Sequence, residues 1–119
     1  MKRESLIILS VAFVLLFGAC ANGQSSPESG QNLSVIKGCA ACHAVDDTPK
    51  VGPSWVGLYE SQVELADGST VTADEAYLIE STVEPNAKIV SGYSKGTMPA
   101  ISLTDDELDA IVDYIKTLK

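Results

Sequence analysis

Two cysteines and a histidine are the residues of this chain whose types and spacing point most directly to chemistry. They stand together as Cys39-Ala40-Ala41-Cys42-His43, and the chain of 119 residues has no second histidine. Thiols at this spacing form a disulfide, act as a redox dithiol, help to hold zinc, or add to the vinyl groups of a haem while the adjacent histidine binds its iron.

The surrounding sequence favours the haem among these alternatives. A closed zinc site needs a complete tetrahedral ligand set, so an aspartate or glutamate would have to complete what the motif supplies. A thioredoxin-like dithiol is expected within a βαβ unit, and the sequence shows no such pattern. We therefore predict one haem c, attached covalently through Cys39 and Cys42, with His43 as an iron ligand.

The opposite side of the haem iron has Met98 as its thioether candidate. A second histidine ligand from the same chain is impossible, and Met1 belongs to the export signal described below. Met98 lies in a loop with glycine and proline that could fold over the haem. A core methionine is the commoner role of such a residue. Lys95 or Tyr93 would be a poorer ligand, and an open iron position is the remaining alternative.

The beginning of the chain has the order of residues of a bacterial export signal. Basic residues precede an apolar stretch over residues 6–17, and small residues then lead to Cys20. This stretch is too short to cross a bilayer, which takes about 20 apolar residues. Residues 16–20 resemble the lipobox of bacterial lipoproteins. We expect a signal peptide over residues 1–19 and a lipid on Cys20; an ordinary secreted protein or an uncleaved anchor is the alternative.

The remainder of the chain divides into a tether and one domain. Residues 20–29 are polar and have no apolar period, which is typical of a flexible linker. Residues 30–119 are expected to form a single folded domain, because a chain of 119 residues leaves little room for two. The formal net charge of −8 at pH 7 argues against nucleic-acid binding, which needs a basic face.

Apolar spacing predicts a short helix before the cysteine motif and a hairpin in the middle of the domain. Leu33, Ile36 and Cys39 recur at helical spacing. Residues 62–72 alternate apolar with polar residues around an Asp-Gly turn, which predicts two short strands. Residues 87–103 are interrupted by glycine, serine and proline and are expected to form a loop.

Two further helices follow the hairpin and the loop. One is predicted over residues 73–82, with Thr72 as its N-cap and Glu75 as the capping-box partner. The other is predicted to begin after Thr104, which is its N-cap, with Glu107 as the capping-box partner. Their apolar faces are expected to comprise Ala76, Leu78, Ile79 and Val83 in the first helix and Leu108, Ile111, Val112, Ile115 and Leu118 in the second.

Taken together, these features resemble a class I c-type cytochrome. The residues that carry the resemblance are Gly30, Leu33, Cys39 to His43, Gly52-Pro53, Gly92-Tyr93, Met98-Pro99 and the capped final helix. In residues 51–53, 67–68, 73–78 and 85–90 the chain is similar to the cytochrome c domain of subunit II of caa3-type oxidases. In layout it is similar to the monohaem lipoprotein subunit of alternative complex III. The resemblance implies an all-α cytochrome c fold around one covalent haem, with a small β-hairpin insert.

The resemblance also implies roles for residues around the histidine. The carbonyl of Pro53 would accept a hydrogen bond from Nδ1 of His43 and so fix the imidazole. Trp55 or Tyr59 would touch a haem propionate, with simple core packing as the alternative.

Further implied roles concern the methionine side of the haem and the helix packing. Tyr93 would shield the side of Met98. Tyr114 would pack the last helix onto the first near Gly38, where the missing side chain lets the two helices approach closely. Ser34 departs from the family, which often has an aromatic residue there that packs near the haem.

Four lysines lie in segments that are expected to border the haem, namely Lys37, Lys50, Lys88 and Lys95. We hypothesise that they steer an acidic surface of a redox partner toward the haem edge. An ordinary solvated surface is the alternative.

The function that we expect is one-electron transfer by a membrane-tethered monohaem cytochrome c in a bacterial respiratory or photosynthetic chain. Its location would be extracytoplasmic, in the periplasm or on the outer face of the cytoplasmic membrane. Its redox partners would be a terminal oxidase or a quinol-oxidising complex. No enzyme activity is expected, because the sequence has no distal acid–base pair. The alternatives are a fixed haem subunit of a larger quinol-oxidising or terminal oxidase complex, and a haem sensor or peroxidase-like protein.

Overall fold

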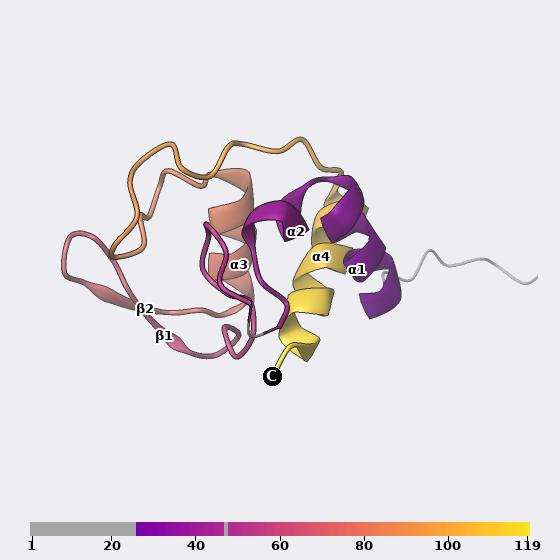
Figure 1. The fold of residues 1–119 in the computed structure, drawn as a ribbon, viewed down its shortest axis with the longest axis horizontal. Coiled ribbons are helices and arrows are strands. Elements are labelled where there is room, and N and C mark those ends of the chain that lie inside the picture. The colour runs from indigo at the N-terminus through magenta and orange to yellow at the C-terminus, as the bar shows by residue number, and fades with distance from the viewer. Residues whose placement is uncertain (1–25, 47) are drawn as a thin grey trace, which may run out of the picture.

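Helices α1 (Pro27–Ile36) and α4 (Asp105–Thr117) pack side by side and form the base on which the rest of the domain is built (Figure 1). The computed structural model describes residues 26–46 and 48–119. The predicted signal peptide, the lipid site at Cys20 and most of the predicted tether lie outside these residues. No helix in the described ranges is long and apolar enough to cross a membrane.

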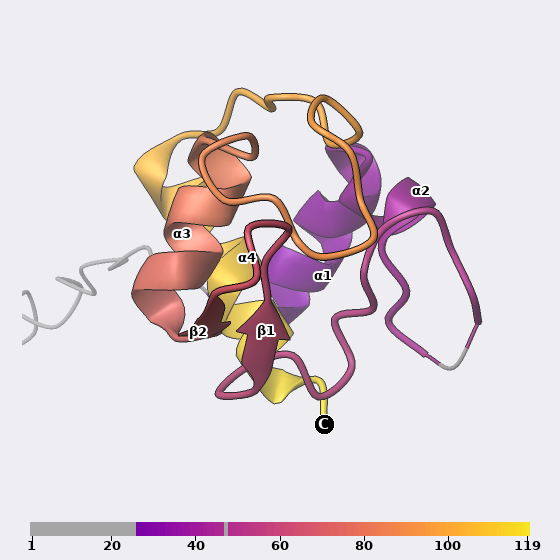
Figure 2. The ribbon, with the colours of Figure 1, turned by 90° about the vertical axis from the view of Figure 1, so that its left-hand side faces the viewer.

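The other elements lie on one side of this helix pair. They are α2 (Cys39–Cys42), the strands β1 (Gln62–Glu64) and β2 (Thr70–Thr72), and α3 (Glu75–Val83). Figure 2 shows the long loop between α3 and α4 arching over the top of the molecule, while the segment after α2 forms its right-hand edge. The described residues are mostly helical and contain one small two-stranded antiparallel sheet, as the sequence predicted.

Helix α1 begins earlier than the sequence suggested. The hydroxyl of Ser26 accepts a hydrogen bond from the backbone N–H of Ser29 at 3.2 Å, and Pro27 occupies the first turn. Both features are favourable at a helix start. The last residues of the predicted tether are therefore helical, and the helix extends before Gly30.

The contact between α1 and α4 depends on Gly30. A Cβ atom at this position would lie 1.9 Å from the carbonyl oxygen of Ala110 and 2.7 Å from Cβ of Tyr114, so only glycine fits. Our expectation that Gly38 makes this approach is wrong, because the space around Gly38 is open. Gly38 instead adopts a φ of +85°, a left-handed conformation that favours glycine. This residue lies between the end of α1 and the start of α2.

The buried face of α1 also differs from the apolar pattern. Gly30 and Ser34 are buried, whereas Ile36 is 76% exposed. Ser34 fits inside because its hydroxyl donates to the carbonyl of Gln31 at 2.7 Å, which satisfies the polar group within its own helix. A small residue here lets α1 lie close to its neighbours, where an aromatic residue would need more room.

Helix α4 forms as predicted. The side chain of Thr104 accepts from the N–H of Glu107 at 3.3 Å, and the carboxylate of Glu107 accepts from the N–H of Thr104 at 3.0 Å, which completes the capping box. Leu108, Ile111, Val112 and Ile115 are buried in one core cluster, and Leu118 is partly buried against it.

The hairpin is also confirmed, but the start of α3 is not. Strands β1 and β2 are antiparallel, with Val63 opposite Val71. Thr72 is still part of β2, so it cannot begin the next helix; Asp74 is the N-cap and accepts from the N–H of Tyr77 at 2.8 Å. Val83, the last residue of α3, is 54% exposed.

The residues of α3 that are buried are Tyr77, Leu78 and Thr82. Of the four residues predicted for its apolar face, Leu78 is buried and Ile79 is partly buried, whereas Ala76 and Val83 are exposed.

Replacing Gly30 with alanine tests the close approach of α1 to α4. We expect Gly30→Ala to lower the free energy of unfolding by about 1–3 kcal/mol or more, because the added methyl group forces the helices apart. Asn32→Ala is the matched control, since Asn32 is exposed on the same helix. Urea unfolding followed by circular dichroism measures both variants. Equal stability of the two would contradict the close approach.

Candidate functional site

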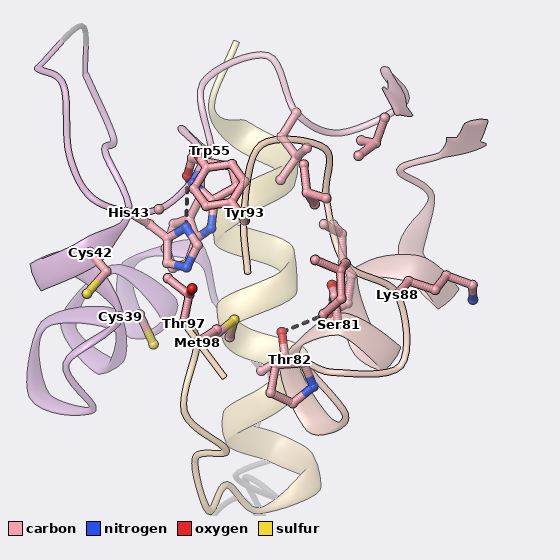
Figure 3. Close-up of a pocket in the computed structure, with 18 of the residues that line it drawn as sticks. Cys39, Cys42, His43, Trp55, Ser81, Thr82, Lys88, Tyr93, Thr97 and Met98 are labelled. Atoms are coloured by element: carbon pink, nitrogen blue, oxygen red, sulfur yellow. Dashed lines mark hydrogen bonds between the residues drawn. The ribbon is translucent and has the colours of Figure 1, made fainter. Parts of the chain in front are cut away.

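A cavity of about 590 Å³ lies between α3, the segment after α2 and the loop before α4. This volume falls within the range of about 300–1,000 Å³ that is usual for cofactor and small-molecule sites. The site residues predicted in the described part of the chain all line it, namely Cys39, Cys42, His43, Pro53, Trp55, Tyr93 and Met98 (Figure 3). Tyr59 is not among the lining residues; its ring lies 5.8 Å below the ammonium group of Lys116.

The two cysteines face the cavity from one turn of helix. Helix α2 places Cys39 and Cys42 on the same side, and both are free thiols (Figure 3). Burial raises the pKa of the Cys39 thiol above its ordinary value. Because Cys39 and Cys42 are not joined to each other, both sulfurs are available for thioether bonds to one haem.

His43 follows directly after α2 and is fixed by the backbone opposite. Its Nδ1 donates to the carbonyl of Pro53 at 2.8 Å, which is the contact that the family resemblance implies. The hydrogen on Nδ1 leaves the lone pair of Nε2 free for a metal. Burial lowers the pKa of His43; the hydrogen bond to Pro53 opposes this with a smaller raising effect, and the positive charge of Lys50 adds a still smaller lowering effect. The imidazole is thus kept neutral, which is the form that binds iron.

Gly52 allows the histidine to sit this close to the neighbouring chain. Its N–H donates to the carbonyl of Cys42 at 2.8 Å. A Cβ atom on Gly52 would lie 3.0 Å from both that carbonyl oxygen and Cε1 of His43, closer than such contacts normally allow. Both residues of the Gly52-Pro53 pair therefore support His43. Gly52 lets the imidazole approach the backbone closely, and the carbonyl of Pro53 accepts its hydrogen bond.

Trp55 lies against the ring of His43. The ring centroids are 5.0 Å apart and the planes differ by 16°, so the two rings are stacked. Trp55 is 6% exposed and belongs to the hydrophobic core. Between the two roles considered for Trp55, core packing is present in the structure. The stack with His43 itself was not anticipated, because no sequence spacing signals it.

Met98 reaches the cavity from the loop between α3 and α4. It is partly buried, and Figure 3 shows its sulfur directed into the cavity that His43 faces. Tyr93 lines the same space from this loop. The first part of the loop pairs with the hairpin. Leu65 and Val90 form an antiparallel β-bridge, and the N–H of Ser91 donates to the carbonyl of Glu64 in β1 at 2.9 Å.

The side chain of Asn86 contacts the second part of this loop. The Oδ1 atom of Asn86 accepts from the N–H of Gly96 at 2.7 Å, across the turn that leads to Met98. In the sequence, Asn86 stands out only as part of residues 85–90, which carry a family resemblance, and nothing there indicates this contact. The asparagine therefore ties the beginning of the loop to the residues just before the methionine.

Two hydroxyl groups of α3 also line the cavity and were missed by sequence reasoning. Ser81 donates to the carbonyl of Tyr77 at 2.7 Å, and Thr82 donates to the carbonyl of Leu78 at 2.8 Å. Hydroxyls within a helix often bond to the preceding turn in this way. An apolar pattern search passes over such residues, although their methyl and methylene groups pack inward.

The four lysines proposed for a docking surface are not equivalent. Lys37 forms an ion pair with Glu107 at 2.8 Å, and Lys88 forms one with Glu80. Lys50 donates to the carbonyl of Ala40. Lys95 is exposed and forms no ion pair within the described ranges. The positive charge of two of the four is thus offset locally.

These residues fit a covalently held haem. The thiols, a neutral imidazole and a thioether all face one cavity, and apolar side chains supply the rest of its wall. In residues 26–46 and 48–119 no group of three or more histidine, cysteine or acidic residues could hold a metal ion alone. The zinc alternative therefore has no complete ligand set in this part of the chain.

The family model described as Cytochrome c matches residues 27–119. The chain belongs to the cytochrome c family. Two curated relatives are cytochromes c2 of Rhodospirillum rubrum. One is 28% identical over 137 aligned positions that cover 100% of both chains. The other is 31% identical over 103 positions that cover 71% of this chain and 92% of the relative.

Among solved structures, cytochrome cH from Methylobacterium extorquens is similar to this cytochrome. The TM-score is 0.57 at 25% sequence identity, and the match covers 77% of this chain and 98% of the other. Family membership confirms the prediction of a class I c-type cytochrome that carries haem c through Cys39 and Cys42. It also identifies the protein as an electron carrier and not an enzyme.

Removal of the Asn86 side chain tests how the methionine loop is held. We expect Asn86→Ala to raise the amide exchange rate of Gly96 about fivefold, because a hydrogen bond contributes about 1 kcal/mol. Asn86→Asp keeps an oxygen acceptor and should preserve the protection. Hydrogen–deuterium exchange followed by NMR measures both variants, and unchanged exchange at Gly96 in the alanine variant would contradict this role of Asn86.

Proposed function

We propose that this cytochrome transfers single electrons through a haem whose iron His43 and Met98 would ligate. The observation that carries the proposal is that both side chains face the same cavity as the cysteine sulfurs. The chain contains one histidine and two methionines, and Met1 opens the predicted signal peptide. No equivalent ligand pair is available from the rest of the sequence.

The protein residues have separate tasks in this function. A bound haem supplies a one-electron couple at its iron. Cys39 and Cys42 prevent its loss, and Pro53 holds the imidazole of His43 in the orientation in which Nε2 faces the cavity. Met98 offers a thioether, which favours the ferrous state and raises the reduction potential.

The segments that carry the two proposed ligands are held by contacts with other parts of the chain. The segment of His43 is fixed through Pro53, and the segment of Met98 is fixed through Asn86 and the hairpin. Electron transfer is fast when little rearrangement accompanies it, so fixed ligands on both sides suit a carrier.

The cellular setting that we propose is the outer face of a bacterial cytoplasmic membrane, with the chain held by a lipid on Cys20. The order of residues in the export signal supports this, and so does the use of the third cysteine. Helix α1 begins at Pro27, so residues 21–26 separate the anchor from the fold. A segment of this length spans at most about 20 Å. The domain would therefore work close to the membrane surface.

The partners that we propose are a quinol-oxidising complex as donor and a terminal oxidase as acceptor, in a respiratory or photosynthetic chain. The exposed side chains beside the cysteine motif support a docking surface there. Ile36 is 76% exposed and Val51 is 67% exposed, next to Lys50 in the sequence. Similarity to the oxidase-linked domain also favours a fixed subunit as the alternative, in which case the chain would co-purify with a complex in mild detergent.

Optical spectroscopy of the haem-loaded protein tests the ligand pair. We expect a pyridine haemochrome of haem c and a ferric sulfur-to-iron band in the wild-type protein. Met98→Ala should abolish the band and let the ferrous form bind carbon monoxide, while the haem stays covalently attached.

Ile101→Ala is the control, because Ile101 lines the cavity without a ligand atom, and it should retain the band. A band that survives in Met98→Ala, or carbon monoxide binding by the untreated wild-type protein, would contradict ligation by Met98. A wild-type protein without covalent haem would contradict the function as a whole.

Charge reversal at two lysines tests the docking surface. Lys50→Glu with Lys95→Glu should slow oxidation by the anion ferricyanide on the order of tenfold at low salt, since the local attraction becomes repulsion. Stopped-flow rates as a function of ionic strength measure the effect. Lys116→Glu with Lys119→Glu makes the same change in net charge at the C-terminal end of α4, which lies away from α2 (Figures 1 and 2). Equal salt dependence in the two double variants would contradict the surface.

A further inference from the structure

The indole of Trp55 covers one face of the imidazole of His43. The centroids of the two rings are 5.0 Å apart and their planes differ by 16° (Figure 3). Both residues line the cavity, and Trp55 is 6% exposed, so water has little access to the stack. Stacking of buried aromatic rings stabilises one relative orientation beyond the effect of burial alone.

Trp55 is itself fixed from two other directions. Its backbone N–H donates to the carbonyl of Ala44 at 2.9 Å. Its ring meets Tyr114 of α4 edge to face, with centroids 6.5 Å apart and planes at 82°. Rotation of the indole would disturb its contact with Tyr114, so this contact and the fixed backbone of Trp55 favour one orientation of the ring against the histidine.

The stack supplies a restraint that the hydrogen bond to Pro53 cannot give. A single bond of 2.8 Å from Nδ1 restrains the ring at one atom, and because a hydrogen bond tolerates misalignment, the plane of the imidazole can still tilt. A flat ring packed against the face of the imidazole opposes this tilt. The two contacts together determine both the direction and the plane of His43.

We propose that Trp55 is a positioning residue that fixes the plane of the His43 imidazole with respect to the haem. This inference rests on ligation of the iron by His43 in the proposed function. Ring orientation controls how the ligand orbitals overlap with those of iron, and contacts around a ligating histidine are known to tune the metal in this way. Trp55 thereby determines the electronic asymmetry of the ferric haem and contributes to its reduction potential.

Substitution of Trp55 by leucine and by phenylalanine tests the proposal. Trp55→Leu keeps an apolar side chain but removes the stacked ring, whereas Trp55→Phe keeps a ring. The proton NMR shifts of the haem methyl groups in the ferric protein report the plane of the axial imidazole. We expect the order or spread of these resonances to change in Trp55→Leu, with a shift in reduction potential, and to remain near wild type in Trp55→Phe.

Leu108→Ala controls for a general loss of packing. Leu108 is buried in the same core but does not line the cavity, so this variant should lose stability and keep the wild-type methyl pattern. If Trp55→Leu does not take up haem, Tyr114→Leu removes the edge contact that supports Trp55 and should give a smaller change of the same kind.

Three outcomes would overturn the proposal: a wild-type pattern in the variant that lacks the stack, the same change in Trp55→Phe as in Trp55→Leu, or an equal change in Leu108→Ala. Each of them leaves a wild-type protein with haem c and a histidine ligand, so the proposed function stands. Absence of a histidine-ligated haem in the wild-type protein would instead remove the proposed function.

Discussion

The hydrogen bond from the imidazole of His43 to the carbonyl of Pro53 is the contact on which the site depends. It joins two parts of the chain that are ten residues apart, across 2.8 Å. Because Nδ1 is committed as a donor, the lone pair of Nε2 faces the cavity. Gly52 makes the approach possible, and Trp55 lies against the ring from the side. The contacts of the segment after α2 therefore hold His43 with its Nε2 atom toward the cavity.

The fold could be predicted from the sequence wherever local chemistry decides it. The capping box of Thr104 and Glu107 depends on residues three positions apart, and the hairpin follows from alternation around its turn. The buried face of α1 could not be predicted, because Gly30 and Ser34 carry no apolar signal and are buried only through the approach of α4. The N-cap of α3 was misassigned because pairing within the sheet, a nonlocal contact, keeps Thr72 in a strand.

In the candidate site, too, residues with distinctive local chemistry could be predicted, whereas contacts between distant segments could not. The cysteine motif and Met98 were found because their chemical types are rare in this chain and each has few alternatives. The supporting residues were found only where the family resemblance supplied them, as with Pro53. The stack of Trp55 on His43 and the contact of Asn86 with Gly96 depend on how distant segments meet. Common residue types at such positions cannot be distinguished from ordinary surface or core residues by spacing.

The burial of Cys39 has a consequence for the order of events in biogenesis. Its side chain is 6% exposed in the folded domain, and burial raises the pKa of its thiol, so the reactive thiolate is scarce there. An unfolded chain offers the whole pentapeptide, with its cysteines at their ordinary reactivity, to an attachment machinery. The covalent bonds are therefore best made before the core around Cys39 is complete. Slow packing of that core would lengthen the interval in which a newly exported chain can be matured.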